Sequence, residues 1–435
     1  MDTEVSVVTA STGAQTFYPT YTAARSAASA RDTIQIWADL YDQLILLKDG
    51  VDIWVAPGRI IETSVSETLI IDNASGYTSA VNVSITGNGI FRNTSAKYGC
   101  IKLVNSNSKV SVICNSLENA ADDTTSLEGS SIYIVNASKF HLRCDRISNA
   151  NQRAIYFANE VSDININANL IENGNIEGGD TISIKGYGFL NANEVICKNE
   201  GSCLNFKAGS LIANILKLTT VNNDVQTSGT IELSGGTGIQ TLTLYFDEIQ
   251  NLSSKDGNTV VANEGKIILI GRRIYSIDGK SMDLSANAEI SVDEIISDSK
   301  GIYIHNGSTQ KIIIDSNKIE GSNGIDGVIK SATNSNYVLR NATIKCTDTS
   351  SSSVCIFIND GSQNSQNIEV ENIVLITGNT TSGETILREG NNTLDIKNLG
   401  LFVNKGIDRA KIILKIGTGD ETGGNFKYIV STDIS

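Results

Sequence analysis

The sequence predicts an all-β fold, a right-handed parallel β-helix of about 14 coils that each add one strand to several parallel sheets. Three observations predict it. A short apolar pattern recurs along almost the whole chain, its residues alternate in and out as strand residues do, and only 2 prolines occur among 435 residues. Because ordinary loops use far more proline, the connections are expected to be short turns within one continuous structure.

The repeat is clearest when residues 110–119, 140–149 and 164–173 are compared. In each segment, alternate residues are expected to point inward. Two consecutive residues that interrupt this alternation follow, and the next residue is an inward apolar residue, here called the anchor. A second alternating patch follows a polar or glycine turn, as in residues 154–157 and 302–304. Two or three short strands per repeat, with no helical pattern between them, predict coils that stack on one another. The expected anchors, 21 to 31 residues apart, are Leu117, Ile147, Ile171, Val195, Leu218, Ile249, Ile274, Ile295, Ile319, Ile344, Ile373 and Leu399.

Stacked coils are expected to lie about 4.8 Å apart, so like residues should lie above one another. Cys114 and Cys144 occupy the same inward position of neighbouring repeats. Asn119, Asn149 and Asn173 share one turn position. We expect these asparagines to form a ladder in which side-chain amides satisfy one another along the stack.

Three regions are predicted. Residues 1–31 form an N-terminal segment with a short capping helix over residues 22–30, beginning at Thr22. The helix is expected to cover the apolar interior and the strand edges at the end of the stack. Residues 32–403 form the β-helix, and residues 404–435, whose glycine-rich stretch breaks the repeat, form a C-terminal cap or attachment segment.

The N-terminal part resembles a known superfamily. Tyr21-Thr-Ala-Ala-Arg leads to Asp32-Thr-Ile-Gln-Ile-Trp-Ala-Asp-Leu-Tyr41, and then to Leu44-Ile-Leu-Leu-Lys-Asp-Gly-Val-Asp-Ile53. This order is similar to the start of pectin-lyase-like right-handed parallel β-helix proteins of the phage tailspike or appendage type. Ala38-Asp39 replaces the usual Pro-Gly. Because the superfamily includes lyases, glycosidases, epimerases, tailspikes and adhesins, the resemblance implies the fold and leaves the activity open.

The composition and charge of the chain limit which classes of binding partner are expected. The chain has 34 basic and 48 acidic residues, a formal net charge of −14, and no Lys/Arg cluster, which argues against nucleic acid or an anionic membrane as the main partner. No run of about 18 apolar residues occurs, so no membrane insertion is expected, and the N-terminus lacks the pattern of a secretory signal. Seven cysteines without a Cys-x-x-Cys pair are expected to be reduced and mostly buried.

Two outward columns beside the anchors carry alternating charge. Two residues before successive anchors are Asp247, Arg272, Asp293 and Asn317; one residue before them are Glu248, Arg273, Glu294 and Lys318. The simplest interpretation is an ion-pair ladder on the surface, because opposite charges attract at strand spacing.

The functional alternative for these columns is a saccharide groove. Asp293 and Glu294 would then be the acid and base or Ca²⁺ ligands, and Arg272 or Arg273 would clamp an acidic sugar or act as the base. The expected substrate contacts are Tyr245, Asp247, Glu248, Tyr275 and Lys318. No cofactor and no metal site is predicted, although Ca²⁺ is possible if the chain is a lyase.

Other residues give weaker signals. Arg143, Asp145 and Arg146 with Arg153 could bind an anionic glycan or be plain surface charges. The histidines His141 and His305 are not flanked by glycine and are expected to be surface strand residues. No nucleophile elbow, phosphate loop or zinc motif occurs.

Three functions remain open. The favoured one is a structural protein of a virion or phage, a tailspike, fibre or capsid-attached appendage for binding host cell-surface polysaccharide or for scaffolding. The second is a polysaccharide lyase or glycoside hydrolase, and the third a bacterial adhesin, which would need an export segment. The resemblance implies a homotrimer that contacts other virion proteins, is made in the host cytoplasm without a signal peptide and is released by lysis.

Overall fold

The computed structural model describes most of the chain up to residue 403. The described residues are 5–65, 68–72, 79–121, 127–174, 179–198, 200–221, 229–234, 240–254, 257–305, 310–322, 328–331, 336–348, 355–358, 367–377, 386–388, 393–403 and 414–415. They fall into two compact units, unit 1 (Met1–Ile215 with Thr237–Ile239) and unit 2 (Leu216–Gly236 with Gln240–Ser435). Apart from Leu414–Lys415, the predicted C-terminal segment 404–435 lies outside the described residues.

Unit 1 is built almost entirely of strands, with one α-helix, α1 (Tyr21–Ala27), and one 3₁₀ turn, η1 (Leu127–Gly129), among its described residues. Its strands are β1 (Val5–Val8), β2 (Gln15–Tyr18), β3 (Thr33–Ile36), β4 (Leu40–Tyr41), β5 (Ile45–Leu46), β6 (Asp52–Val55), β7 (Ile60–Thr63), β8 (Ile70–Ile71), β9 (Asn82–Gly87), β10 (Ile90–Asn93), β11 (Ile101–Leu103), β12 (Lys109–Ile113), β13 (Ser116–Asn119), β14 (Ile132–Ile134), β15 (Lys139–Asn149), β16 (Ile155–Phe157), β17 (Val161–Asn173) and β18 (Ile182–Cys197).

Unit 2 is likewise built of β-strands. The strand β19 (Leu204–Thr220) contains the boundary residue Ile215. The strands that follow are β20 (Gly229–Leu233), β21 (Gln240–Asn251), β22 (Asn258–Ala262), β23 (Lys266–Ser276), β24 (Lys280–Leu284), β25 (Asn287–Ser297), β26 (Lys300–Ile304), β27 (Ile312–Gly321), β28 (Ile329–Ser331), β29 (Asn336–Arg340), β30 (Thr343–Cys346), β31 (Ile356–Ile358), β32 (Asn367–Thr377), β33 (Ile386–Arg388), β34 (Thr393–Val403) and β35 (Leu414–Lys415).

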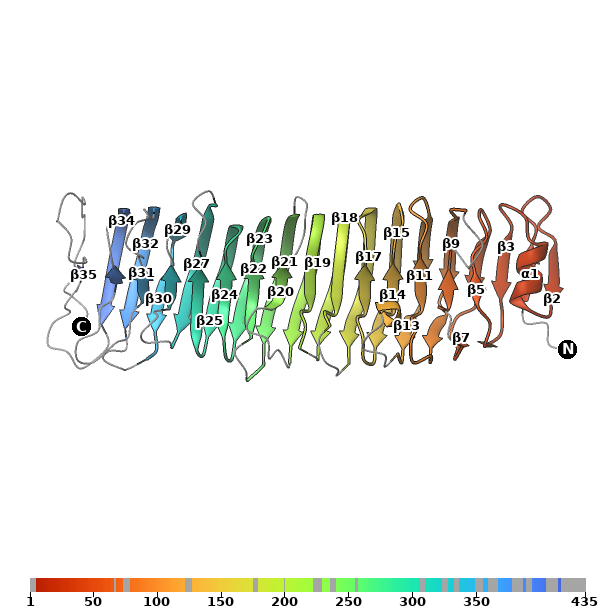
Figure 1. The fold of residues 1–435 in the computed structure, drawn as a ribbon, viewed down its shortest axis with the longest axis horizontal. Helices are drawn as coiled ribbons and strands as arrows, with labels where there is room; N and C mark the ends of the chain where they lie inside the picture. The colour runs from red at the N-terminus through yellow and green to blue at the C-terminus, as the bar shows by residue number, and fades with distance from the viewer. Residues whose placement is uncertain are drawn as a thin grey trace. The chain divides into compact units, whose positions relative to one another are not determined.

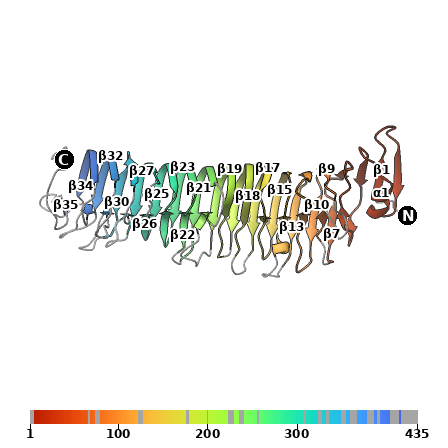
Figure 2. The same ribbon diagram turned by 45° about the horizontal axis from the view of Figure 1, so that its top comes forward.

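Within each unit, a strand pairs in parallel with the corresponding strands one repeat earlier and later. In unit 1, β15 pairs with β12 and β13 on one side and with β17 on the other. In unit 2, β23 pairs with β21 and β25 in the same way. Figures 1 and 2 show, within each unit, its strands side by side in sequence order. The described chain is therefore all-β with long parallel sheets, an arrangement consistent with the predicted β-solenoid.

The predicted anchors form inward columns in both units. Leu117, Ile147, Ile171 and Val195 are register partners in sequence, and all are fully buried. Ile249, Ile274, Ile295, Ile319 and Ile344 form the equivalent column of unit 2. The last two predicted anchors are wrong by two residues.

The correct partners continue the column of Ile344. This residue pairs with Leu375, which pairs with Leu401, rather than with Ile373 and Leu399. The bend lies two residues earlier in β32, where Glu371 and Asn372 face outward, than in β27, where Asn317 and Lys318 do, so Ile373 is the first buried residue after the bend although Leu375 occupies the column. A purely periodic template could not detect that shift.

The two residues that interrupt the alternation before each anchor form a bend. In β15, Phe140, Leu142 and Cys144 are buried, Asp145 and Arg146 both face solvent, and Ile147 is buried again. Two consecutive outward residues turn the strand direction at this point and place charged side chains on the outer corner of the coil. The chemistry described below lies on these corners.

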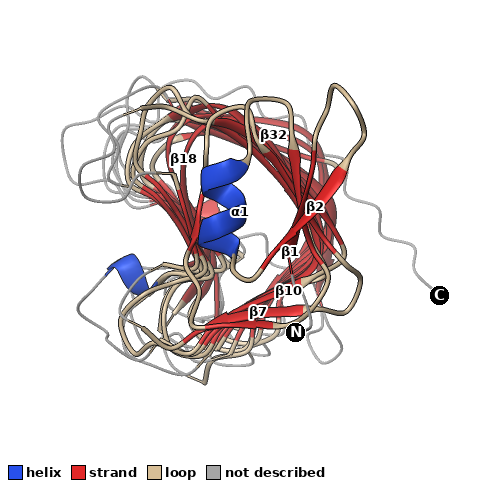
Figure 3. Cartoon of the chain, turned by 90° about the vertical axis from the view of Figure 1, so that its right-hand side faces the viewer, coloured by secondary structure: helices blue, strands red, loops and turns tan. Residues whose placement is uncertain are grey.

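The N-terminal end differs from the parallel stack. Before α1, β1 and β2 form an antiparallel pair, and β1 also pairs antiparallel with β3. The helix begins at Tyr21, because the hydroxyl of Thr20, not Thr22, accepts the first helical amide proton, from Ala23, at 3.1 Å. Figure 3 shows α1 at this end, seen along the strand stack of unit 1. The predicted segment 1–31 thus contains two strands that the repeat pattern did not indicate.

The asparagines of the predicted ladder are buried, but they form different hydrogen bonds from those expected. Asn119 donates to the carbonyl of Gly129 at 2.6 Å, and Asn149 donates to Gly129 and Arg153. Their Oδ1 atoms accept backbone amides two or three residues later. Each amide thus holds the loop that follows its strand, and Asn173, which donates to Gly179, does the same. The seven cysteines are all buried and free, as expected.

Candidate functional site

The predicted charge ladder exists in unit 2 as a column of register partners. Glu248 on β21, Arg273 on β23, Glu294 on β25 and Lys318 on β27 lie opposite one another on successive coils. All four occupy the second of the two outward corner positions, because the following residue in each strand is a buried isoleucine.

Ion pairs link the first three coils of the ladder. Arg272 makes a two-pronged contact with Asp247, with Nε to Oδ1 at 2.7 Å and a second N–H to Oδ2 at 3.1 Å. Arg273 donates to Glu248 at 3.1 Å and lies 3.7 Å from Glu294. The arrangement therefore has the geometry of the simpler interpretation, opposite charges matched coil by coil.

These contacts disfavour acid–base chemistry at the ladder. The hydrogen bond from Arg272 holds the pKa of Asp247 below its usual range, and the same contact raises the pKa of Arg272. A carboxylate stabilised in its charged form is a poor proton donor, and a guanidinium that keeps its proton is a poor base.

The predicted substrate contacts of the ladder do not act as a group. Tyr275 lies 4.7 Å below the Arg273 guanidinium, and its hydroxyl donates to Asp298 at 2.6 Å. Lys318 contacts Glu320 on its own strand at 2.7 Å. Tyr245 is 42% exposed and its register partner is Ile270, so it lies outside the charged column.

Calcium does not fit the ladder. Asp293 accepts the Asn317 amide at 3.1 Å, and Glu294 lies against Arg273, so each candidate ligand has a donor or a cation beside it. Ca²⁺ needs several oxygen ligands converging on one point. In the part of the chain that the structure describes, no three His, Cys, Asp or Glu side chains gather in a way that could hold a metal ion.

A second charged region, on the corners of unit 1, forms an open groove of about 350 Å³. Its charged lining comes from five successive coils. These side chains are Arg92, Glu118, Arg146, Glu172 and Lys198. Ser148 lies between the two glutamates in register, since Glu118 pairs with Ser148 and Ser148 with Glu172.

Glu172 is the best-enclosed acid of this groove. Its side chain is only 10% exposed; Oε1 accepts from the Arg146 guanidinium and Oε2 from Lys198 at 2.9 Å. Burial raises the pKa of Glu172, but the contacts from Lys198 and Arg146 outweigh it and hold the pKa below its ordinary value. The carboxylate thereby fixes two cations that are themselves about half exposed to the groove.

The other glutamate is held in a similar way. Glu118 accepts from Arg92 Nε at 2.9 Å and from the Ser116 hydroxyl at 3.0 Å, while Arg92 also contacts Glu62 at 3.3 Å. The groove thus offers oriented N–H and hydroxyl donors next to paired carboxylates. This set suits the recognition of a sugar carboxylate and hydroxyl groups.

Of this groove, only Arg146 is among the residues predicted from the sequence. The predicted columns lie one and two residues before each anchor, whereas Arg92, Glu118 and Glu172 come one residue after Phe91, Leu117 and Ile171. The signal that could have found them is the column one residue after the anchor, which runs Glu62, Arg92, Glu118, Ser148, Glu172. Arg153, which was predicted to act together with Arg146, instead lies 5.3 Å from the Tyr156 ring.

The two histidines each contact an aspartate. His141 lies 2.8 Å from Asp163 in unit 1. In unit 2, His305 contacts the largely buried Asp283, which Lys280 also contacts. Burial raises the pKa of Asp283, but His305 and Lys280 hold it below its usual value.

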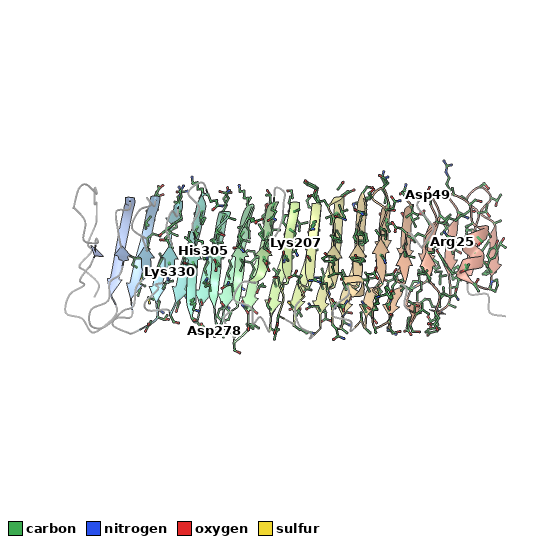
Figure 4. All side chains as sticks on the ribbon, in the orientation of Figure 1. Arg25, Asp49, Lys207, Asp278, His305 and Lys330 are labelled. Carbon is green, nitrogen blue, oxygen red and sulfur yellow. The ribbon has the colours of Figure 1, made fainter. Side chains whose placement is uncertain are left out.

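The His305 cluster surrounds Tyr303. The two rings are 4.0 Å apart, and Lys280 and Lys330 lie 4.5 and 5.6 Å from the tyrosine ring. Figure 4 labels His305 and Lys330, which come from successive repeats of unit 2. Because both lysines approach the ring, we interpret this cluster as packing on the sheet rather than as a sugar platform.

Comparisons with known proteins return no relative: no family model, no curated protein and no solved structure matches the chain. No helix among the described residues has the length and apolar character needed to cross a membrane. The side chains described above are therefore the basis of the proposed function.

Proposed function

We propose that the chain is a polysaccharide-binding β-solenoid of a virion or phage appendage, and that the groove of unit 1 binds an acidic sugar of a host cell-surface polymer. The observation that carries the ligand class is the geometry of Arg146 and Lys198. Both are oriented by the enclosed carboxylate of Glu172 and remain about half exposed at the groove. Cations positioned in advance lose little entropy when they meet a carboxylate.

Binding is favoured over hydrolysis by the state of the two glutamates. Glu118 and Glu172 are two register steps apart, roughly 9–10 Å at ordinary strand spacing, which is near the separation used by inverting glycosidases. Such an enzyme needs one carboxyl group that keeps its proton at neutral pH. The lowered pKa of Glu172 disfavours this role for Glu172, and the carboxyl group of Glu118 is engaged by the hydrogen bond from Arg92.

The finer structural features belong to the same proposal. They are a right-handed winding of about 14 coils, a capping role for α1, a pectin-lyase-like ancestry and a homotrimeric assembly attached to other virion proteins. The parallel pairing in both units and the N-terminal sequence resemblance support this proposal. A polysaccharide lyase or glycoside hydrolase using Asp293 and Glu294 remains the alternative function.

The test is a panel of acidic and neutral polysaccharides, scored for binding, for new reducing ends and for the absorbance of unsaturated uronates. We expect binding of at least one acidic polymer without cleavage. The double variant Arg146→Gln/Lys198→Gln should bind it at least about tenfold more weakly, because two charge-assisted contacts are lost. The control is Arg143→Gln/Lys109→Gln, which removes two exposed cations of the same unit outside the groove.

Two outcomes would overturn the proposal. If the control variant lost as much binding, general electrostatic attraction would be enough to explain the interaction. Cleavage of a polymer that disappears in Asp293→Ala or Glu294→Ala would make the chain an enzyme and place its site on the ladder.

A further inference from the structure

One outward face of unit 1 carries apolar and amide side chains where neighbouring coils carry charges. On β15 the face presents His141, Arg143 and Asp145. Two coils later, on β18, the outward residues are Tyr187, Phe189, Asn191 and Asn193, none of which is charged. The adjoining part of β19 continues with Ser210, Ile212 and Asn214. We call these last seven residues the aromatic–amide face.

The aromatic side chains of this face are unusually exposed for strand residues. Tyr187 is 47% and Phe189 is 49% exposed. The glycines on either side of Tyr187, Gly186 and Gly188, have φ values of 137° and 147°, where a side chain is strained. A Cβ atom at Gly188 would lie 2.0 Å from the carbonyl oxygen of Ile164, so the backbone here lies tightly against β17 while the rings point outward.

A chain of amide hydrogen bonds runs beside the rings. Asn214 donates to Asn191 at 2.7 Å, Asn191 to Asn167 at 2.8 Å, and Asn167 to Asn165 at 2.7 Å. The first two bonds run from coil to coil and the third runs along β17, and in each the later asparagine donates, so the three donor amides are fixed in orientation. An asparagine amide has two N–H donors, and each bond of the chain uses one of them. The second N–H of Asn214, Asn191 and Asn167 is not used in this chain.

The apolar residues lie next to this chain of hydrogen bonds. Asn165 is the register partner of Phe189. The bond between Asn214 and Asn191 aligns β19 with β18, and Ile212 and Phe189 lie two residues before these asparagines. Ile212, 36% exposed, thus extends the ring surface of Phe189 by one coil.

We propose that the aromatic–amide face binds an uncharged stretch of polysaccharide. A pyranose ring has an apolar C–H face, which packs on an aromatic ring, and an edge of hydroxyl groups, which exchange hydrogen bonds with amides. The face offers both kinds of contact at strand spacing and no charge. The inference rests on the proposed ligand class, polysaccharide, but on different residues from the groove of unit 1.

A second copy of the chain fits this face less well. The three exposed apolar side chains are surrounded by amide side chains, and they cover much less than the area of a stable protein interface. The fixed amides would also need matching polar groups on the partner. Self-association through the face is therefore an outcome of the test rather than the proposal.

The test is native gel electrophoresis of the full chain through gels containing dextran, a neutral galactan or polygalacturonate. Migration of the native chain should be retarded by at least one of the neutral polymers. Phe189→Ala and Tyr187→Ala should each weaken that retardation about tenfold, because an aromatic contact is lost. Tyr41→Ala is the control, since Tyr41 is an equally exposed aromatic residue of unit 1, at 58%, on β4.

The outcomes separate this inference from the proposed function. No retardation by any neutral polymer, or equal loss in Tyr41→Ala, overturns the inference. Loss of polygalacturonate binding in Arg146→Gln/Lys198→Gln, with neutral binding intact, would support two separate sites. A native mass greater than one chain that falls to one chain in Phe189→Ala would show that the face joins copies of the protein, and would also overturn it.

Discussion

The groove of unit 1 and the ladder of unit 2 are both built from charged residues at the corners of parallel coils, but they differ in depth. In the groove, Glu172 is only 10% exposed and holds two cations. In the ladder, the outer pair Asp247 and Arg272 is 54% and 49% exposed, whereas Glu248 beside Arg273 is 13% exposed. The same repeat therefore produces in one unit a groove with an acid that orients two cations, and in the other an ion-pair column whose outer pair is solvated.

The difference comes from the positions of the charged residues in the repeat. Glu118 and Glu172 of the groove follow the buried anchor and alternate with inward side chains, and Arg146 reaches Glu172 from the position before its own anchor. The outer ladder pair, Asp247 and Arg272, stands two residues before the anchor on the outside of the bend, where water screens it. The depth of a charge, rather than its sign pattern, decides how much it can orient a ligand.

The largest expected effect concerns what the two units share, their inward anchors. Phe91→Ala in unit 1 and Ile274→Ala in unit 2 each leave a cavity at a site with at most 1% exposure. We expect each to lower the local free energy of unfolding by about 3–4 kcal/mol. Hydrogen–deuterium exchange of the flanking strands measures this loss, and a much smaller loss in one unit would show that its column packs loosely.

A somewhat smaller effect is expected for the turn asparagines, also present in both units. Asn149→Ala and Asn251→Ala remove amides that bond to backbone groups of the following loop. Because buried backbone groups would each lose a hydrogen bond, including the amides that donate to the asparagine Oδ1 atoms, each change should cost about 2–3 kcal/mol. Asn317→Ala, which removes an exposed amide, is the control and should leave hydrogen exchange unchanged.

The groove itself should show a pH-dependent effect. The pKa of Glu172 is lowered in the folded chain, so its stabilising contribution is present above the ordinary glutamate value of 4.5 and is lost as the pH falls through the folded pKa. At pH 7, Glu172→Gln should lower the local stability of β15 and β17 by about 2 kcal/mol. The difference from the native chain should vanish at pH values well below 4.5, and a difference that grows on acidification would contradict the ionised state.

The smallest effect is expected at the ladder. Arg272→Ala should leave hydrogen exchange of β21 and β23 unchanged at physiological salt, because the contact with Asp247 is exposed to water on both sides. Melting curves at low and high salt provide a second measurement. A loss of local stability in Arg272→Ala as large as that in Glu172→Gln would show that the ion pairs of the groove and of the ladder contribute equally.

Much of the fold could be predicted from the sequence, because inward positions must be apolar and strand residues alternate. The anchors from Leu117 to Ile344, the bends and the buried free cysteines follow from that pattern. The antiparallel β1 and β2 could not be predicted, since a single pair has no repeat to compare with. Ile373 was misplaced because the bend lies two residues earlier in β32 than in β27 while the register is unchanged.

The sites were less predictable than the fold. Glu248, Arg273, Glu294 and Lys318 were correctly predicted to share one column, but the sequence could not show that Glu248 is enclosed beside Arg273 while Asp247 and Arg272 stay exposed. Two acids were overlooked: Glu172, which Arg146 and Lys198 contact from other coils, and Glu118, which Arg92 contacts from the preceding coil. Distances between side chains on different coils are set by bends and side-chain conformations, which have no period.

The sequence by itself therefore determined the strand content, the stacking of repeats and the columns that face inward, because burial of apolar side chains imposes a period that can be read directly. Only the tertiary structure decided which outward charges are enclosed, which asparagines bond to backbone and which to each other, and where aromatic rings remain exposed. Those properties depend on how far each side chain lies from water and from its neighbours on other coils, and that distance is a property of the folded chain.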